Sequence, residues 1–142
     1  MTFLDASAIC AVLLEEADSD FFLERIEQAE QPRTSPVAIF ESVLALAKVL
    51  GGDVHLAQMK VDAFLRLAGA ETVAIGEAEL DRALYAFDRY GKGRHPARLN
   101  MGDCFAYACA RTHGVPLLFK GGAGARPTSR LPEAVSERPL AG

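Results

Sequence analysis

Three acidic residues stand where an apolar segment ends, is interrupted or begins, and acids in such places can hold a metal ion. Asp5 follows the apolar run 2–4, Glu41 lies inside the almost wholly apolar segment 37–50, and Asp103 precedes the small apolar residues of 104–110. An unpaired carboxylate is costly to bury, so each acid needs a cation or a shifted pKa. Hard divalent cations such as Mg²⁺ and Mn²⁺ take oxygen ligands from a few carboxylates and water. Together the three acids predict a divalent-metal site.

Each acid also has a purely structural interpretation. Asp5 could cap the next helix with help from Ser7, Glu41 could point into water, and Asp103 could favour the dipole of the helix it begins. Glu41 is the hardest to explain in this way, because the nearest cation in its helix, Lys48, lies about two turns further on. The case for a metal therefore depends on the three acids together, since without an ion they would repel one another.

Other chemistries find little support in the sequence. Ser7 lacks a GxSxG context, and the chain contains neither a Walker loop nor a GxGxxG motif. The three histidines are not at metal-ligand spacing, and each is better placed on the surface or in a loop: His55, His95 and His113. Four aromatic residues recur at helical spacing without interleaved basic residues, which predicts core positions rather than a base-stacking surface: Phe64, Tyr85, Phe87 and Tyr107.

Composition describes an ordinary globular chain. Its 142 residues suit one domain, with 50% hydrophobic and 24% charged residues. A net charge of −4 argues against broad electrostatic binding of nucleic acid, but not against RNA reached through bound metal ions. Without an apolar run of membrane length or a basic N-terminal region, we expect no membrane span, no signal peptide and a cytoplasmic protein. Three cysteines without a CxxC pattern are expected to be free and buried: Cys10, Cys104 and Cys109.

Strand and helix patterns alternate along the chain. Strands are expected at 2–5, about 33–34, 71–75 and 115–120, and helices at 6–16, 18–30, 36–50, 53–69, 76–91 and 103–114. This order predicts a parallel sheet with helices on both faces, a three-layer α/β domain. In such sheets ligands bind beyond the carboxyl ends of the strands, where Asp5 stands.

Four segments carry a resemblance to a known family: "TFLDASAICAVLLEE", "SPVAIFESVLAL", "RHPARLNMGDCFAYACA" and "PLLFKG". In this order they resemble PIN-domain proteins, specifically VapC-type toxins of bacterial toxin–antitoxin pairs. The resemblance implies a three-layer α/β/α sandwich over residues 1–121, with a mostly parallel sheet. It also implies a metal-dependent endoribonuclease that cuts structured RNA of the tRNA or rRNA class. The implied partners are a VapB-type antitoxin that blocks the site and a second copy in a homodimer.

The resemblance also assigns roles to individual residues. Asp5, Glu41 and Asp103 match the family's first three acids, with Asp5 and Asp103 as the most direct ligands of Mg²⁺ or Mn²⁺. Ser7 matches a small hydroxyl residue beside the first acid, and we place it with the catalytic residues. Three cations are expected to hold RNA phosphate near these acids: Arg94, Arg98 and Lys120. Arg98 is as readily explained as a solvated surface charge.

The end of the chain departs from the family pattern. The family continues "LLFKG" with an acidic loop and then Thr-Asp-Ile, whereas Gly122 and Ala123 occupy the acidic positions here. Codons can be chosen for Arg126–Pro132 so that another frame reads Thr-Asp-Ile-Ala-Pro-Ala. Our hypothesis is a shifted reading frame from about Gly122, which the gene sequence would test. Residues 122–142 are expected to form an irregular, poorly ordered tail.

A missing fourth acid leaves the functional prediction with alternatives. Loss of a group that supports a metal ligand costs about 10–100-fold in metal affinity or activity, so we expect weakened metal binding and reduced cleavage. The chain could instead be a catalytically impaired PIN domain that acts as an antitoxin-binding, regulatory module. A metal-dependent phosphatase or phosphodiesterase on a similar scaffold is a third possibility, although its usual nucleophile loops are missing.

Overall fold

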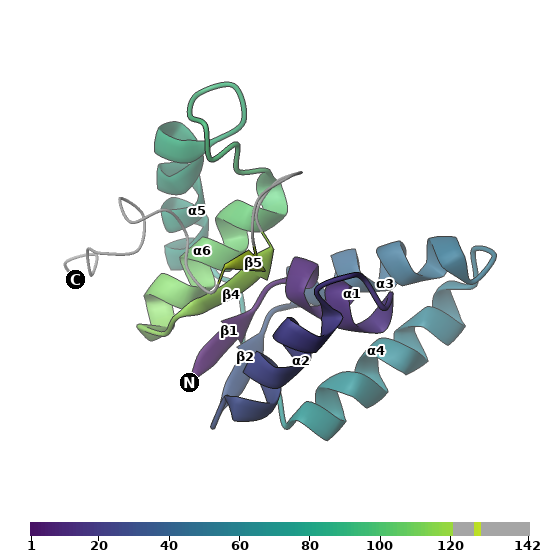
Figure 1. The fold of residues 1–142 in the computed structure, drawn as a ribbon. Coiled ribbons are helices and arrows are strands. Elements are labelled where there is room, and N and C mark those ends of the chain that lie inside the picture. Colours follow the sequence, from purple (N-terminus) through teal and green to yellow (C-terminus); the bar gives the residue numbers. More distant parts are fainter. Residues whose placement is uncertain (121–126, 129–142) are drawn as a thin grey trace.

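A twisted sheet runs through the middle of the molecule in the computed structural model, which describes residues 1–120 and 127–128 (Figure 1). Its strands are β1 (Thr2–Leu4), β2 (Pro32–Thr34), β3 (Glu71–Thr72), β4 (Leu117–Lys120) and β5 (Pro127–Thr128), in the spatial order β3-β2-β1-β4-β5. The first four strands run parallel, and β5 pairs antiparallel with β4. The sequence did not predict β5, which is the part of the expected 122–142 tail that lies within the described residues.

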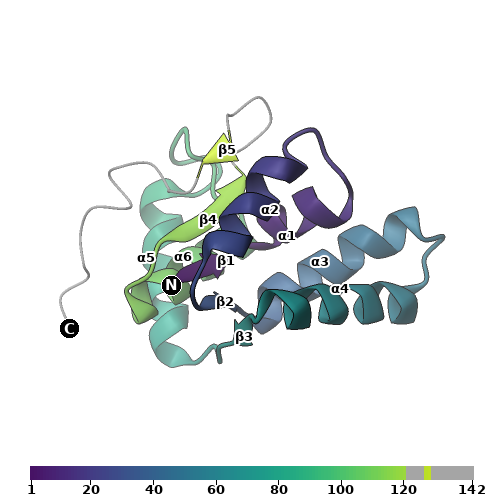
Figure 2. The same cartoon turned by 60° about the horizontal axis from the view of Figure 1, so that its bottom comes forward.

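Helices cover both faces of the sheet. On one side lie α1 (Ala6–Leu13), α2 (Ser19–Gln28), α3 (Pro36–Val49) and α4 (Val54–Ala68); on the other lie α5 (Glu77–Tyr90) and α6 (Met101–His113) (Figure 2). Each face has its own apolar core, because the central strands β1 and β4 are apolar on both sides. The predicted three-layer α/β/α sandwich with a mostly parallel sheet is confirmed.

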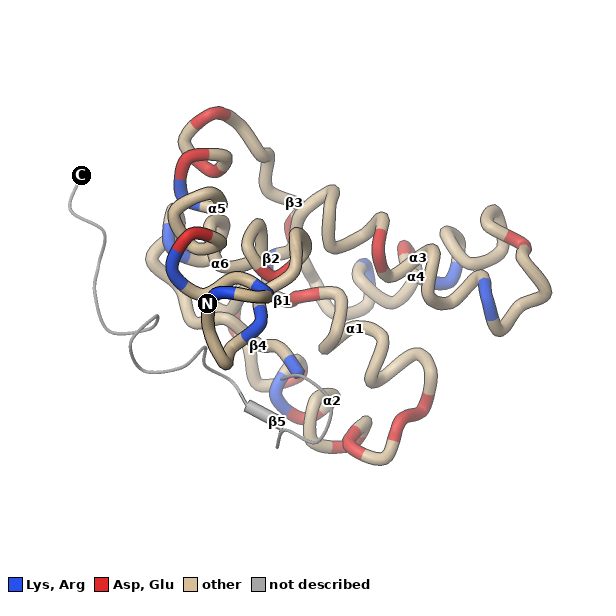
Figure 3. Tube along the Cα trace, turned by 90° about the horizontal axis from the view of Figure 1, so that it is seen from above, with Lys and Arg blue, Asp and Glu red and all other residues tan. Residues whose placement is uncertain are grey.

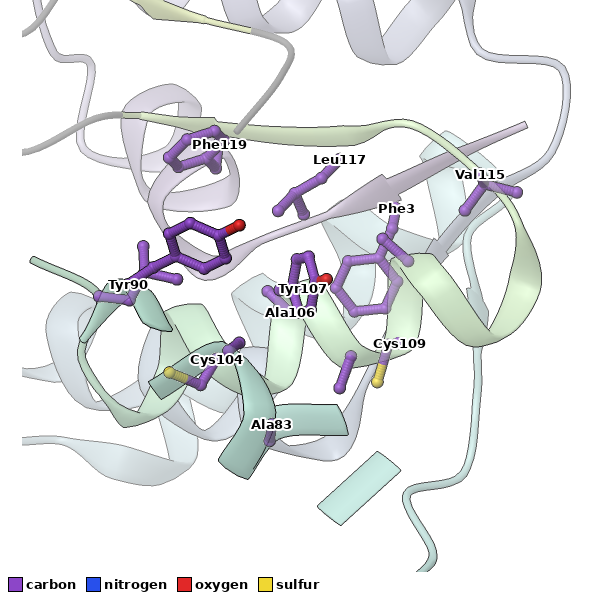
Figure 4. Packing of buried hydrophobic residues seen from close by; sticks show 14 of the residues in the cluster. Phe3, Ala83, Tyr90, Cys104, Ala106, Tyr107, Cys109, Val115, Leu117 and Phe119 are labelled. Carbon is purple, nitrogen blue, oxygen red and sulfur yellow. The ribbon is translucent and has the colours of Figure 1, made fainter. Parts of the chain in front are cut away.

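The core beneath α5 and α6 shows how the central strands are fixed. Figure 4 shows Phe3 of β1 and Leu117 of β4 packed with Tyr107 of α6, and Phe119 lies near Tyr90 at the end of α5. Phe3 and Tyr107 are almost completely buried, and burial of large apolar side chains contributes roughly 1.5–3 kcal/mol each. These residues hold β1 between β2 and β4, so the carboxyl end of β1 is well defined.

Two of the expected core aromatics are instead on the surface. Tyr85 and Phe87 of α5 are 39% and 40% exposed, and guanidinium groups lie over both rings, Arg89 over Tyr85 and Arg94 over Phe87. The prediction failed because α5 packs against α6 and the core through its small residues Ala83 and Ala86. Tyr107, by contrast, is buried as predicted, and all three cysteines are free and buried.

Helix ends also differ from the sequence pattern. α1 ends at Leu13 rather than at residue 16, and the turn that follows places Glu15 at a positive φ of 51°. α6 begins at Met101 rather than at Asp103, because Asn100 supplies the N-cap. Asp103 therefore lies within the first turn of α6. No helix in the described part of the chain is long and apolar enough to span a membrane.

The strand order creates a switch point beside Asp5. From β1 the chain builds the sheet in one direction through β2 and β3, and then returns to place β4 on the other side of β1. In open parallel sheets, ligands bind at the carboxyl ends of strands where the order reverses in this way. α1 and α3 start directly after β1 and β2, so their first turns lie at this carboxyl edge.

Candidate metal centre

Asp5 connects the end of β1 to the start of α1. It is only 4% exposed, and its backbone N–H continues the β1–β4 pairing by donating to the Leu118 carbonyl at 3.1 Å. Its carboxylate caps α1, because Oδ2 accepts from the Ser7 N–H at 3.0 Å and from the Ser7 hydroxyl at 2.6 Å. Burial, assisted by the charge of Asp103, raises the pKa of Asp5 to about 6 in spite of the Ser7 hydrogen bonds.

Asp103 lies in the first turn of α6, and its carboxylate, like that of Asp5, takes part in capping a helix. Its carboxylate Oδ2 accepts from the Asn100 N–H at 3.0 Å, while the Asn100 side chain accepts from the Asp103 N–H at 2.9 Å, which forms a reciprocal capping pair. Burial raises the pKa of Asp103 although the Asn100 bond lowers it. In both aspartates the capping bonds fall on Oδ2, so Oδ1 has more capacity to bind a metal ion.

Glu41 reaches the same region from α3. None of the described residues donates a hydrogen bond to the Glu41 carboxylate, which lies against Gly102 in the first turn of α6. Burial, followed by the charges of Asp5 and Asp103, raises the pKa of Glu41 to about 7. The structure therefore brings the three predicted acids within electrostatic reach of one another, and no cation of the described residues is among the charges that act on them.

These acids fit a hard divalent cation by the chemistry of their oxygens. Within residues 1–120 and 127–128, no three His, Cys, Asp or Glu side chains already surround an ion position. Partly buried negative charges without a cation repel one another, so an ion-free site holds its carboxylates together only at a cost. An ion with two positive charges would offset the desolvation that raises their pKa values and draw the carboxylates together. Asp5, Asp103 and Glu41 are the residues that would hold it.

Ser7 links this site to β4. Its hydroxyl donates to Asp5 Oδ2 and accepts from the Lys120 backbone N–H at 2.8 Å, so both of its usual bonding directions are used. These bonds fix the Asp5 carboxylate relative to the end of the sheet. The geometry favours a positioning role for Ser7 over attack on a substrate.

Replacing Ser7 by alanine is expected to weaken the metal site more than the fold. Ser7→Ala removes one bond to Asp5 and leaves the Lys120 N–H without its acceptor, which should lower the free energy of unfolding by about 1 kcal/mol. Cleavage should fall about 10–100-fold, with a higher Mn²⁺ requirement. Rates measured over a Mn²⁺ titration, with Ser7→Thr as the variant that keeps the hydroxyl, check this. An unchanged Mn²⁺ requirement in Ser7→Ala would contradict it.

Lys120 is already held by acids from another part of the chain. Its Nζ lies 2.5 Å from Glu16 Oε2 and 3.1 Å from Asp18, both in the connection between α1 and α2, and these contacts raise the pKa of Lys120. Figure 3 shows acidic positions along this connection. An RNA phosphate would have to compete with two carboxylates for Lys120. No sequence pattern predicts this contact, because more than a hundred residues separate the partners.

The other predicted phosphate ligands lie in the connection between α5 and α6. Arg94 is about half exposed, pairs with Asp88 at 3.2 Å and lies 5.6 Å from the Phe87 ring. Arg98 adopts a left-handed backbone with φ 52°. The histidines take no part in the acid site: His95 Nδ1 accepts from the Ala97 N–H, and His113 Nδ1 lies 2.8 Å from an Arg33 nitrogen.

Two residues of the site were missed from the sequence. Asn100 could have been recognised, because Asn100 and Asp103 have the spacing of a capping box. Gly102 could not, because its closeness to Glu41 depends on how α3 packs against α6. The position of the expected fourth acid, at residues 122–123, lies outside the described residues.

Comparisons with known proteins agree with this fold. Residues 2–125 match the PIN domain family, so the chain belongs to the PIN-domain proteins. It is 36% identical to Ribonuclease VapC of Mycolicibacterium smegmatis over 118 residues, which span 83% of this chain and 89% of that protein. It is 38% identical to a VapC ribonuclease of Rhizobium meliloti over 85% of this chain and 94% of that one.

A solved structure shows the same architecture. The crystal structure of Mycobacterium tuberculosis VapC20, described as a Sarcin-Ricin loop cleaving toxin, superposes with a TM-score of 0.68 and 15% identity. The match covers 93% of this chain and all of that one. At this identity the likeness concerns the fold, whereas the family assignment rests on the sequence matches.

Proposed function

We propose that this chain is a metal-dependent endoribonuclease of the VapC type, the toxin of a toxin–antitoxin pair. The observation that carries the proposal is the group of three partly or wholly buried acids at the switch point of the sheet. Their pKa values are raised, and no cation in the part of the chain that the structure describes offsets them. The VapC ribonucleases that match most of the chain support the same activity. The substrate class we propose is structured RNA, such as tRNA or rRNA.

Each residue of the site has a defined task in this proposal. Asp5, Asp103 and Glu41 hold Mg²⁺ or Mn²⁺, which supplies an activated water and offsets charge on the phosphate. Ser7 and Asn100 fix the two aspartates by the hydrogen bonds described above. Arg94 and Lys120 bind RNA phosphate, with Lys120 contributing less because Glu16 and Asp18 already offset its charge.

The proposed partners are a VapB-type antitoxin and a second copy of the chain, in the cytoplasm. Apolar side chains that are exposed on helices support an assembly of this kind. Phe40 and Leu44 of α3 are 64% and 43% exposed, and Leu84 of α5 is 58% exposed. Molecular mass in solution, measured by light scattering for the wild type and Phe40→Ser, would test the homodimer; a monomeric wild type would remove it from the proposal.

The proposed activity is tested by incubating total cellular RNA with the purified protein in Mg²⁺ or Mn²⁺. An EDTA sample and the Asp5→Asn variant are the controls. Discrete cleavage that needs both the metal and Asp5 would support the nuclease and show that three acids suffice. A folded protein that binds an antitoxin but cuts no RNA would instead support the impaired, regulatory module.

Arg94→Ala is expected to raise the KM for RNA about 5-fold with little change in kcat, because an exposed charge that binds phosphate contributes roughly 1 kcal/mol. The effect should shrink as salt rises. Arg25→Ala is the matched control, since Arg25 also lies over a phenylalanine ring, at the end of α2. Initial rates over an RNA titration check this, and equal effects from the two variants would argue against a specific role for Arg94.

A further inference from the structure

Gly102 is a buried glycine that a larger residue could not replace without disturbing the acid site. A Cβ placed on it would lie 2.5 Å from Glu41 Cδ and closer still to both carboxylate oxygens, whereas real Cβ contacts stay beyond 3.0 Å. Gly102 does not need a left-handed backbone, unlike Gly69 and Gly114, which end helices at positive φ. Glycine is therefore favoured at this position because the Glu41 carboxylate occupies the space that a side chain would need.

Helix stability does not explain this choice of residue. Gly102 is the second residue of α6, and glycine destabilises a helix relative to alanine. The space that it leaves is filled by the carboxylate of Glu41 from α3. There the carboxylate lies at the positive end of the α6 dipole and close enough to Asp103 for the two charges to interact.

We propose that Gly102 is a positioning residue of the metal site. Its missing side chain allows Glu41 to lie against the first turn of α6, where its carboxylate can share an ion with Asp5 and Asp103. A methyl group at position 102 would push Glu41 away while leaving the other two acids on their caps. This inference rests on the proposed metal-dependent activity and adds the residue that sets the place of the third acid.

A cycle of single and double variants separates positioning from general stability. Gly102→Ala should lower the Mn²⁺ affinity of the purified protein about 10–100-fold in calorimetric titrations. In a Glu41→Ala background, which already lacks the third carboxylate, Gly102→Ala should cause no further loss of affinity. The metal-free Tm should rise by a few degrees beside Glu41→Ala, because alanine is the better helix former, and should rise less in the wild-type background, where the Glu41 carboxylate must move aside.

Gly76→Ala is the matched control for a glycine at the start of a helix. Gly76 precedes α5, and a Cβ there would meet only Glu79 Oε2 at an ordinary 3.8 Å. This variant should keep the wild-type Mn²⁺ affinity. A comparable loss in Gly76→Ala would show that the measurement reports helix ends in general, and would overturn the proposal.

Further outcomes decide the proposal even if a variant folds poorly. Wild-type Mn²⁺ affinity in Gly102→Ala, or an equal further loss in the Glu41→Ala background, would overturn it. If Gly102→Ala alone does not fold, a folded Glu41→Ala/Gly102→Ala protein supports the overlap, and an unfolded one contradicts it. If the wild type neither binds Mn²⁺ nor cuts RNA, the proposed function fails, while the metal-free Tm cycle still tests the contact between Gly102 and Glu41.

Discussion

Asp5→Asn is expected to make the metal-free protein more stable and to remove its RNA cleavage. Asparagine keeps a side-chain oxygen that can accept from the Ser7 N–H, so the cap of α1 survives. It removes a buried negative charge whose pKa is raised from 3.8 to about 6, a shift that corresponds to about 3 kcal/mol of destabilisation when the group is ionised. A gain of about 1–3 kcal/mol is therefore expected above pH 7 in EDTA.

Cleavage should respond in the opposite direction. A metal ligand supports several kcal/mol of charge stabilisation, so its loss should lower the rate on the order of 10²–10³-fold. Asp53→Asn is the matched control, because Asp53 also caps a helix, accepting from the Leu56 N–H at 2.9 Å, but is exposed. Denaturant unfolding and cleavage rates of both variants give the answer. An Asp5→Asn protein that is less stable than the wild type at pH 8 would mean that the ionised Asp5 carboxylate does not destabilise the folded protein.

The metal-free protein should lose stability as the pH rises from about 4 to about 7. In this window the unfolded chain has already released the protons of Asp5 and Glu41, whose ordinary pKa values are 3.8 and 4.5. The folded chain still holds them, because its values are about 6 and about 7. The folded state thus binds more protons, and the free energy of unfolding falls with rising pH until both groups are ionised.

Divalent metal should reverse this trend. An ion that binds the ionised carboxylates stabilises the folded state most where they carry their charges, so millimolar Mn²⁺ should raise Tm strongly at pH 8 and little at pH 5. Thermal unfolding from pH 4 to 8, in EDTA and in Mn²⁺, measures both effects. Glu41→Gln/Asp5→Asn is the control in which both effects should be much smaller, because only Asp103 is left to contribute. Stability in EDTA that is flat or rises with pH would contradict the prediction.

The sequence predicted the parts of the fold that depend on local pattern. The apolar runs before Asp5 and before Lys120 predicted the two central strands, and the alternation of strands with helices predicted the three layers. Helix surfaces were harder, because small residues can pack against a neighbouring helix as well as aromatic ones do, and α5 buries Ala83 and Ala86 while Tyr85 lies outside.

The candidate site was predictable to a similar extent. Asp5, Glu41 and Asp103 were selected because an acid in an apolar segment needs an explanation. Their neighbours could not be selected in this way. The bonds from Lys120 to Glu16 and Asp18, and the contact of Glu41 with Gly102, join residues far apart in the chain, and only the packed structure brings them together.

The pairing of β1 with β4 also decides when the site can form during synthesis. Asp5 is made more than a hundred residues before its partners, because the carbonyl that receives its N–H belongs to Leu118, and the N–H that fixes Ser7 belongs to Lys120. A chain still attached to the ribosome lacks these partners until nearly all of the domain has emerged. Before that point Asp5 has neither its strand partner nor its fixed orientation. The acid group is therefore assembled only as the domain is completed.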